Sequence, residues 1–239
     1  MSVKKHIPNL LTLLNLFCGC IAIVLVSDFN FEYAFYFVCL GIFFDFFDGF
    51  FARKFGVAGP LGVQLDSLAD MVTSGVAPGY TMVYLLSGMT FHMPLADYLP
   101  YLGFIITLGA CYRLANFNID TRQSDSFIGL PTPANTLFIM SLPLVLQYQG
   151  DTIWGDLLVN KYVLLSITVL SAFVMNAEIP LFSLKIKNFS VAKYKLQIGF
   201  VLFSIALIVL LKVVAVPLII MSYVLLSVLN TIFSKKELV

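Results

Sequence analysis

The chain alternates long apolar runs with short stretches rich in glycine, proline, asparagine or serine. Apolar runs of about 20 residues are long enough to cross the hydrocarbon core of a bilayer as helices. The pattern therefore predicts an all-α polytopic bundle of about eight transmembrane spans. The predicted spans are 8–27, 33–52, 61–87, 99–117, 132–148, 161–177, 196–212 and 214–233. The fifth and sixth are short for a full crossing, which suits helices that are tilted or partly interfacial.

The composition supports this interpretation. Of the 239 residues, 60% are hydrophobic and 11% are charged, whereas soluble domains have about 25% charged residues. No internal repeat and no low-complexity linker divides the chain. We therefore expect one multi-pass integral membrane domain over residues 1–239, surrounded by membrane lipid, with no nucleic-acid polymer as a partner.

Basic residues predict the orientation, because cytoplasmic segments of membrane proteins carry an excess of lysine and arginine. If the N-terminus lies inside, the outer segments hold only Lys161 and Lys212. The inner segments then hold Lys4, Lys5, Arg53, Lys54, Arg113, Arg122, Lys185, Lys187, Lys193, Lys195, Lys235 and Lys236. We expect both termini, and the functional site, to face the cytoplasm, and we expect the membrane to be a bacterial inner membrane.

Four carboxylates interrupt the second and third apolar runs: Asp45, Asp48, Asp66 and Asp70. Spacings of three and four residues place each pair on one face of its helix. An intramembrane carboxylate costs roughly 2.5–3.5 kcal/mol, so four cost on the order of 10 kcal/mol without compensation. Carboxylate oxygens are preferred ligands of Mg²⁺ and Mn²⁺. We therefore expect one or two divalent cations between these helices.

Small and basic residues beside the acids extend this picture. Gly49 and Ala52 share the face of the first acid pair and leave space for a ligand, and Arg53 can neutralise a phosphate. Two cations held by two acid pairs would favour displacement at phosphorus, because they stabilise both the attacking and the leaving oxygen. Asp70 could instead accept the proton of an attacking hydroxyl.

A polar stripe runs along the first predicted span, where Asn9, Thr12 and Asn15 recur at helical spacing. Interhelical hydrogen bonding, which is common in membrane bundles, would explain it. The alternative is that these residues reach the acidic site.

A second polar stretch follows the fourth span and contains Arg113 and Asn116. It leads to the start of the fifth span, where two prolines flank Thr132. Such a turn exposes backbone groups and can shape a small pocket. An ordinary loop followed by a helix start is the alternative interpretation.

The full acidic motif reads D-x2-D-G-x2-A-R-x8-G-x3-D-x3-D, from Asp45 through Gly62 to Asp70. It resembles the signature of the CDP-alcohol phosphotransferase family, with every position present. The resemblance implies a helical membrane enzyme, usually a homodimer, with a CDP-linked donor and two divalent ions, Mg²⁺ or Mn²⁺. It implies that Asp45, Asp48 and Asp66 are chiefly metal ligands, and that Asp70 is the catalytic base and also lies close to the metals.

Two further stretches resemble the branch of the family that uses L-serine as acceptor: Pro8–Gly19, and Arg113–Asn118 followed by Gly129–Ala134. The continuation Ser74–Pro78 after the last aspartate resembles the same branch. This resemblance implies phosphatidyl transfer from CDP-diacylglycerol to the serine hydroxyl, with a catalytic core at about residues 1–150. The nucleotide pocket is then expected to be lined by Asn9, Thr12, Asn15, Gly49, Ala52, Arg53 and Gly62. Serine is expected to bind near Arg113, Asn116, Pro131 and Thr132.

Three alternatives remain open. Another family member would use glycerol-3-phosphate or inositol phosphate, but such acceptors call for more basic residues than this site offers. An archaeal-type lipid donor is a second possibility. An ion or proton transporter would spread its acids across the membrane depth, whereas these lie within 26 residues on one side.

Overall fold

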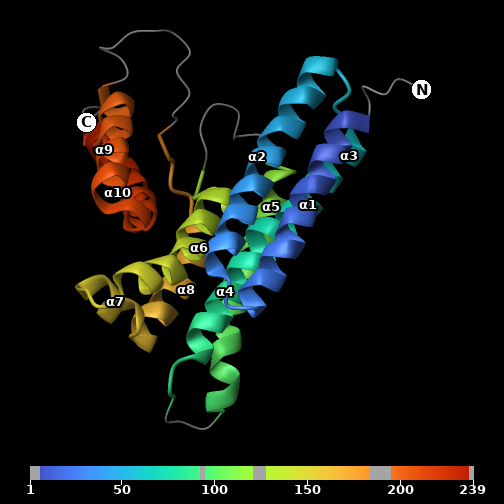
Figure 1. Ribbon diagram of the computed structural model, residues 1–239. Coiled ribbons are helices and arrows are strands. Elements are labelled where there is room, and N and C mark those ends of the chain that lie inside the picture. Colours follow the sequence, from blue (N-terminus) through green and yellow to red (C-terminus); the bar gives the residue numbers. More distant parts are fainter. Residues whose placement is uncertain (1–5, 92–94, 121–127, 183–194, 237–239) are drawn as a thin grey trace.

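The computed structural model describes residues 6–91, 95–120, 128–182 and 195–236, which are almost entirely helical (Figure 1). This confirms the expected all-α class. The elements in chain order are α1 (His6–Ser27), α2 (Phe31–Phe55), α3 (Pro60–Asp70), the π-helix η2 (Met71–Val76), α4 (Ala77–Ser87), the 3₁₀ helix η3 (Ala96–Phe104), α5 (Ile105–Phe117), α6 (Thr132–Gln149), α7 (Ile153–Leu158), α8 (Lys161–Asn176), α9 (Lys195–Leu211), the 3₁₀ turn η4 (Lys212–Val214) and α10 (Ala215–Lys236).

Helices α1 and α2 form an antiparallel pair that runs side by side along one edge of the molecule (Figure 1). Helix α2 ends at Gly56, which has φ 63° and donates its N–H to the carbonyls of Ala52 and Arg53. A residue without Cβ adopts this left-handed conformation at little cost, so the helix stops sharply there. Pro60 then opens α3 at a position where a missing N–H costs nothing. The short turn returns α3 alongside α1, so α1 contacts both acid-bearing helices.

The third predicted span is not one regular helix. It consists of α3, the π-helix η2 and α4, which follow one another without a gap. A π-turn inserts extra backbone into a helix and changes which face the following side chains occupy. Two threonine hydroxyls from other helices donate to its carbonyls: Thr136 to Ser74 at 3.1 Å and Thr107 to Gly75 at 2.9 Å.

Other helix boundaries agree with the predicted spans to within a few residues, apart from two additions. The short helix α7 lies between the fifth and sixth predicted spans, and the fourth span begins with the 3₁₀ helix η3 rather than as an α-helix. Four described segments are long and apolar enough to cross a membrane: His6–Ser27, Phe31–Phe55, Ala96–Phe117 and Leu196–Ile232. The chain is thus a multi-pass integral membrane protein. Several basic residues used to predict orientation lie outside the described residues: Lys4, Lys5, Arg122, Lys185, Lys187 and Lys193.

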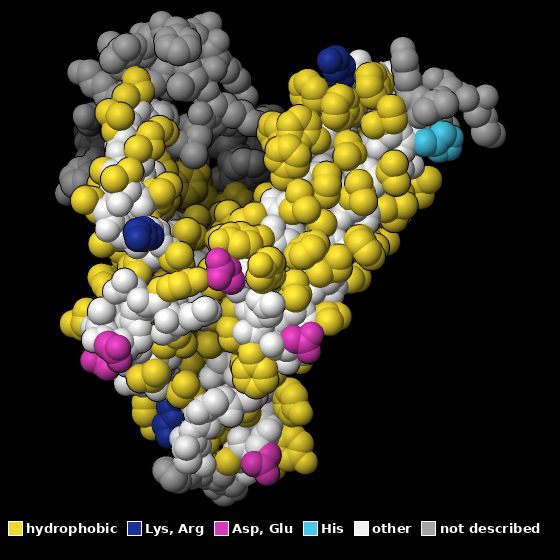
Figure 2. Space-filling view, in the orientation of Figure 1, with side chains coloured by type: hydrophobic (Ala, Val, Ile, Leu, Met, Phe, Trp, Pro, Cys, Tyr) yellow, Lys and Arg dark blue, Asp and Glu magenta, His cyan; other side chains and the backbone are white. Residues whose placement is uncertain are grey.

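The interior consists of two apolar clusters. The larger is built mainly from α4, α5, α6 and α8 around Met82, Ile106 and Ile139. The smaller joins α1, α2, α4 and α6. Large apolar side chains also cover the outside of the helices, as Figure 2 shows over α1 and α2. Phe46 is 66% exposed and Leu210 76% exposed, as expected for surfaces that contact lipid rather than water.

Candidate active site

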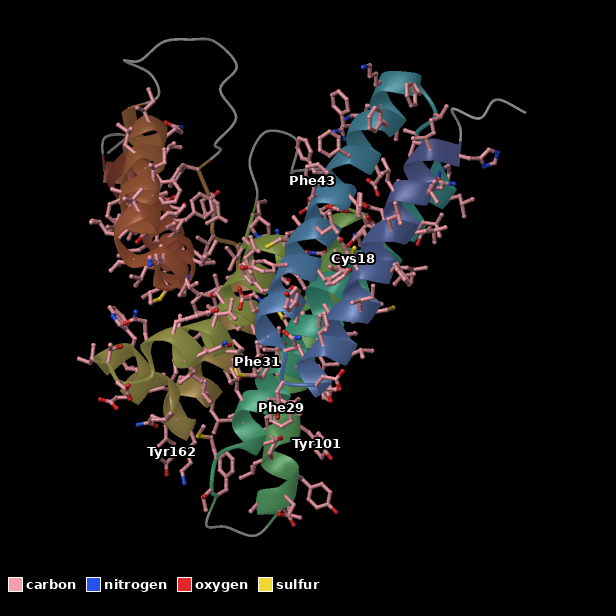
Figure 3. The ribbon with its side chains drawn as sticks, in the orientation of Figure 1. Cys18, Phe29, Phe31, Phe43, Tyr101 and Tyr162 are labelled. Atoms are coloured by element: carbon pink, nitrogen blue, oxygen red, sulfur yellow. The ribbon has the colours of Figure 1, made fainter. Side chains whose placement is uncertain are left out.

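The fold brings together the four carboxylates predicted to form the site. Asp45 and Asp48 come from α2, and Asp66 and Asp70 come from the end of α3. One oxygen each of Asp45, Asp48 and Asp66 lies within 4.8 Å of the others. Asp45 is also within hydrogen-bonding reach of Asp66 and Asp70. Figure 3 labels Phe43 on α2, and Asp45 and Asp48 follow it along that helix toward its C-terminal end.

The cluster fits a bound cation. Carboxylates so close together repel one another when ionised. Either they share a proton, or a positive ion lies between them. Oxygen ligands of Mg²⁺ bind at about 2.1 Å, so two ligands of one ion are at most ~4.2 Å apart. Small side-chain adjustments would therefore let Asp45, Asp48 and Asp66 share an ion. Asp70 lies beside this group and is 9% exposed.

Helix α1 supplies hydrogen-bond donors to both acid pairs. The Thr12 hydroxyl lies 2.5 Å from Oδ2 of Asp48, and Nδ2 of Asn15 donates to Oδ1 of Asp70 at 3.0 Å. Thr12 and Asn15 are three residues apart, so they share the face of α1 that is turned toward α2 and α3. Part of the polar stripe thus makes interhelical hydrogen bonds, and those bonds go to the acidic site.

An open pocket adjoins the acids at the junction of α1, α2 and α3. Its lining includes most of the residues predicted for the nucleotide: Asn9, Thr12, Gly49, Ala52, Arg53 and Gly62, together with Asp48 and Asp66. Asn15 is not among the lining residues. It is fully buried on the Asp70 side of the cluster, because its position one turn deeper on α1 places it behind the acids rather than at the pocket mouth.

Gly49 gives Arg53 its place in this pocket. The guanidinium folds back over the preceding turn of α2, so a Cβ added at Gly49 would lie 3.2 Å from Nη1 of Arg53. The small residue therefore leaves room for the Arg53 guanidinium in a pocket that Asp48 also lines. An anion entering the pocket would meet this guanidinium at its wall.

The residues predicted to bind serine occupy a different part of the bundle. Arg113 is 8% exposed, and its Nη1 donates to the carbonyls of Ile128, at 2.9 Å, and Met175. Asn116 is exposed near the end of α5, Pro131 is partly buried, and Thr132 is buried at the start of α6. Arg113 thus ties α5 to the end of α8 and to the segment that enters α6.

Sequence reasoning missed two contacts near the acids. Nδ2 of Asn118 donates to the hydroxyl of Ser67, next to Asp66, at 2.8 Å. The Thr73 hydroxyl donates to the backbone carbonyl of Asn15 at 3.0 Å. Asn118 lies in the polar stretch already singled out, so its composition offered a signal. Thr73 gave none, because threonine is common in buried transmembrane helices.

Comparison with known proteins agrees with this geometry. Residues 5–174 match the model of a family described as CDP-alcohol phosphatidyltransferase. The chain is 38% identical over 133 residues to CDP-diacylglycerol–serine O-phosphatidyltransferase of Bacillus subtilis, covering 54% of this chain and 70% of that protein. It is 30% identical over 194 residues to the Helicobacter pylori enzyme of the same name, covering 80% of this chain and 76% of that one. It is 32% identical over 146 residues to archaetidylserine synthase of Methanothermobacter thermautotrophicus, covering 60% of each.

Proposed function

This chain belongs to the CDP-alcohol phosphatidyltransferase family, and we propose that it transfers the phosphatidyl group of CDP-diacylglycerol to the hydroxyl of L-serine. The products are phosphatidylserine and CMP, so the enzyme acts in phospholipid biosynthesis. Similar proteins that carry this activity in their names come from bacteria, an archaeon and yeast. The observation that carries the proposal is the convergence of Asp45, Asp48 and Asp66 within 4.8 Å.

The donor's polar head binds in the pocket between α1, α2 and α3. Asn9, Thr12, Gly49, Ala52 and Gly62 line the space for the nucleotide, and Arg53 neutralises phosphate charge. Asp45, Asp48 and Asp66, with Asp70 beside them, would hold two ions of Mg²⁺ or Mn²⁺. Bound ions supply Lewis-acid stabilisation of the charge on the phosphate oxygens.

Asp70 is the base that accepts the serine hydroxyl proton. The serine oxygen then bonds to the phosphorus that carries the lipid, and the bond from that phosphorus to the CMP oxygen breaks. The hydrogen bond from Nδ2 of Asn15 to Oδ1 of Asp70 supports this role, since a general base must be held at a fixed place beside its substrate.

The serine carboxylate is held by Arg113, with Asn116, Pro131 and Thr132 forming the wall of its site. Arg113 has five N–H donors. Among the described residues, Nη1 donates to the carbonyls of Ile128 and Met175. The edge of the guanidinium that carries the other nitrogens can face a carboxylate. An unchanged serine KM in Arg113→Ala, measured beside its thermal stability, would remove this assignment.

The topology that suits this chemistry has eight spans, with both termini and the pocket on the cytoplasmic side. Arg53 and Lys54 lie at the pocket end of α2, in keeping with an inner face rich in positive charge. The working enzyme is a homodimer in an inner membrane. Cysteine labelling from either side of the membrane tests the orientation, and mass measurement of the detergent-solubilised enzyme tests the dimer.

One assay separates the candidate activities. Purified enzyme with CDP-diacylglycerol and Mn²⁺ should release CMP rapidly with L-serine. Release should be at least ~100-fold slower with glycerol-3-phosphate or inositol phosphate, because a site built for one acceptor leaves buried polar groups unpaired with another. CMP release that is equal with all three acceptors would overturn the assignment of serine. Because archaetidylserine synthase is among the similar proteins, CMP release should also be measured with an ether-linked archaeal donor.

A further inference from the structure

Asn15 contacts the proposed base through an unusual arrangement. Its side chain is fully buried, and Nδ2 donates to Oδ1 of Asp70 at 3.0 Å. An ionised carboxylate can only accept hydrogen bonds, so the amide must turn its NH₂ toward Asp70. Among the described residues, Oδ1 of Asn15 then has no hydrogen-bond partner. A buried oxygen without a partner stabilises nothing, so the fold gains little from asparagine here apart from the contact with Asp70.

The backbone of Asn15 is attached to the same turn. The Thr73 hydroxyl donates to the Asn15 carbonyl at 3.0 Å, and Thr73 is fully buried. Since Asp70 and Thr73 are three residues apart, α1 and the α3–η2 junction are joined at two points. The bond from Asn15 to Asp70 orients the carboxylate. The bond from Thr73 to the Asn15 backbone fixes the position of α1 along its axis relative to that carboxylate.

Gly19 and Gly41 pack tightly against the α3–η2 junction. A Cβ at Gly41 would lie 2.9 Å from Oδ1 of Asn15 and 3.0 Å from Cγ2 of Thr73. A Cβ at Gly19 would collide with the Thr73 hydroxyl and lie 2.9 Å from its Cα. Helices α1 and α2 therefore approach the junction closely, and the Asn15 amide has little freedom to rotate.

The far side of the junction is held as well. The π-helix η2 begins directly after Asp70, and its Ser74 and Gly75 carbonyls accept from Thr136 of α6 and Thr107 of α5. Asp70 thus lies between α1 on one side and a turn bonded to two other helices on the other.

From this geometry we propose that Asn15 is the positioning residue for Asp70, with Thr73 holding Asn15 in register. The proposal rests on the proposed role of Asp70 as base. Asn15 fixes the orientation of the Asp70 carboxylate by bonding to one of its oxygens, so that the other oxygen faces the acceptor hydroxyl. Misorientation of this carboxylate affects the transition state and not substrate binding. A misplacement of about 1 Å costs on the order of 100-fold in rate.

The test uses the full-length enzyme in nanodiscs, with CDP-diacylglycerol, L-serine and Mn²⁺. Asn15→Leu keeps the volume and removes the donor. We expect its kcat to fall about 100-fold, with both KM values within about twofold of wild type, because only the transition state is affected. Thr73→Val, a near-isosteric change that tests the same link if Asn15→Leu folds poorly, should lower kcat about tenfold with KM unchanged. Thr168→Val is the matched control, because Thr168 is equally buried and, among the described residues, its hydroxyl bonds within its own helix, to Leu164. The kcat of this variant should stay at the wild-type value.

A double-mutant cycle separates positioning from a general structural effect. In an Asp70→Asn background, Asn15→Leu should lower the residual kcat by less than about threefold, since residues that act through one another are not additive. If Asp70→Asn is impaired and Asn15→Leu costs the same factor in both backgrounds, the positioning role fails while the proposed base stands. If Asp70→Asn keeps the wild-type kcat, the base assignment fails, and the positioning role fails with it.

Discussion

The Thr12 hydroxyl lies 2.5 Å from Oδ2 of Asp48, so a helix without acids of its own at the site makes direct contact with the acid pair of α2. Thr12 is 3% exposed and Asp48 is 5% exposed. A hydrogen bond from a hydroxyl to a buried carboxylate satisfies one of its acceptor sites and fixes its direction. Helix α1 therefore helps to orient the carboxylate that we propose as a metal ligand.

Thr12→Val should weaken metal activation. Hydrogen bonds to charged groups contribute about 1.5–3 kcal/mol, so the Mn²⁺ concentration for half-maximal CMP release should rise about 10- to 100-fold. Thr81→Val serves as a control, because that buried hydroxyl bonds, among the described residues, to the Ala77 carbonyl and to Sδ of Met140 rather than to an acid. An unchanged Mn²⁺ requirement in Thr12→Val would show that Asp48 needs no support from α1.

Asp66→Asn should raise the Tm of the metal-free enzyme and reduce the further stabilisation that Mn²⁺ provides. In metal-free enzyme it removes one of several repelling carboxylates, so Tm should rise by about 2–4 °C for each kcal/mol of repulsion relieved. The increase in Tm that Mn²⁺ causes in the wild type should shrink, because a ligand stabilises only in proportion to its affinity for the folded state. Asp28→Asn, at an exposed position after α1, should change neither value. A full Mn²⁺-induced shift in Asp66→Asn would argue against a shared cation site.

Gly49→Ala should impair donor binding. The new Cβ would lie 3.2 Å from Nη1 of Arg53, which is closer than ordinary contact, so the guanidinium must shift by a few tenths of an ångström from its place in the pocket. We expect the KM for CDP-diacylglycerol to rise about tenfold, the equivalent of losing ~1.4 kcal/mol of binding. Gly199→Ala is the control, because a Cβ there meets no atom within 4 Å. Equal kinetics for the two variants would mean that Arg53 does not act through its position over Gly49.

Gly129→Ala should destabilise the enzyme. Gly129 has φ 73°, and a Cβ there would run into the carbonyls of Met175 and Ala177 and into Arg113. Strain of this kind costs on the order of 1–3 kcal/mol, so Tm should fall by several degrees. Gly88→Ala, at φ −74° with its nearest contact at 3.6 Å, should leave Tm within about 1 °C. A Tm for Gly129→Ala as high as that of the control would contradict the close packing seen around Arg113.

Much of the fold follows from local pattern. Apolar runs predicted the helices because a segment in lipid must satisfy its backbone internally, and a helix does so. The run over 61–87 shows where this fails. Its hydropathy does not reveal the π-helix at Met71–Val76, because the hydroxyls that accompany that turn come from Thr107 and Thr136, far away in the sequence.

The candidate site was also predictable in part from the sequence. The spacing of Asp45, Asp48, Asp66 and Asp70 indicated two acidic faces, since spacing within a helix is a local property. The partner of Asn15 was not predictable from the stripe alone. One turn of α1 decides whether a side chain lines the pocket, as Thr12 does, or lies behind the acids beside Asp70, as Asn15 does. Likewise, the charge of Arg113 was evident, whereas its bonds to the carbonyls of Ile128 and Met175 were not.

The sequence alone determined that this chain is a helical membrane protein with two acid pairs in a family-specific spacing, because hydropathy and helical periodicity are written along the chain. Only the tertiary structure decided which donors face those acids and how closely the helices approach. Those relationships depend on helix packing, on the positive φ of Gly56 that returns α3 beside α1, and on glycines that meet side chains from distant segments.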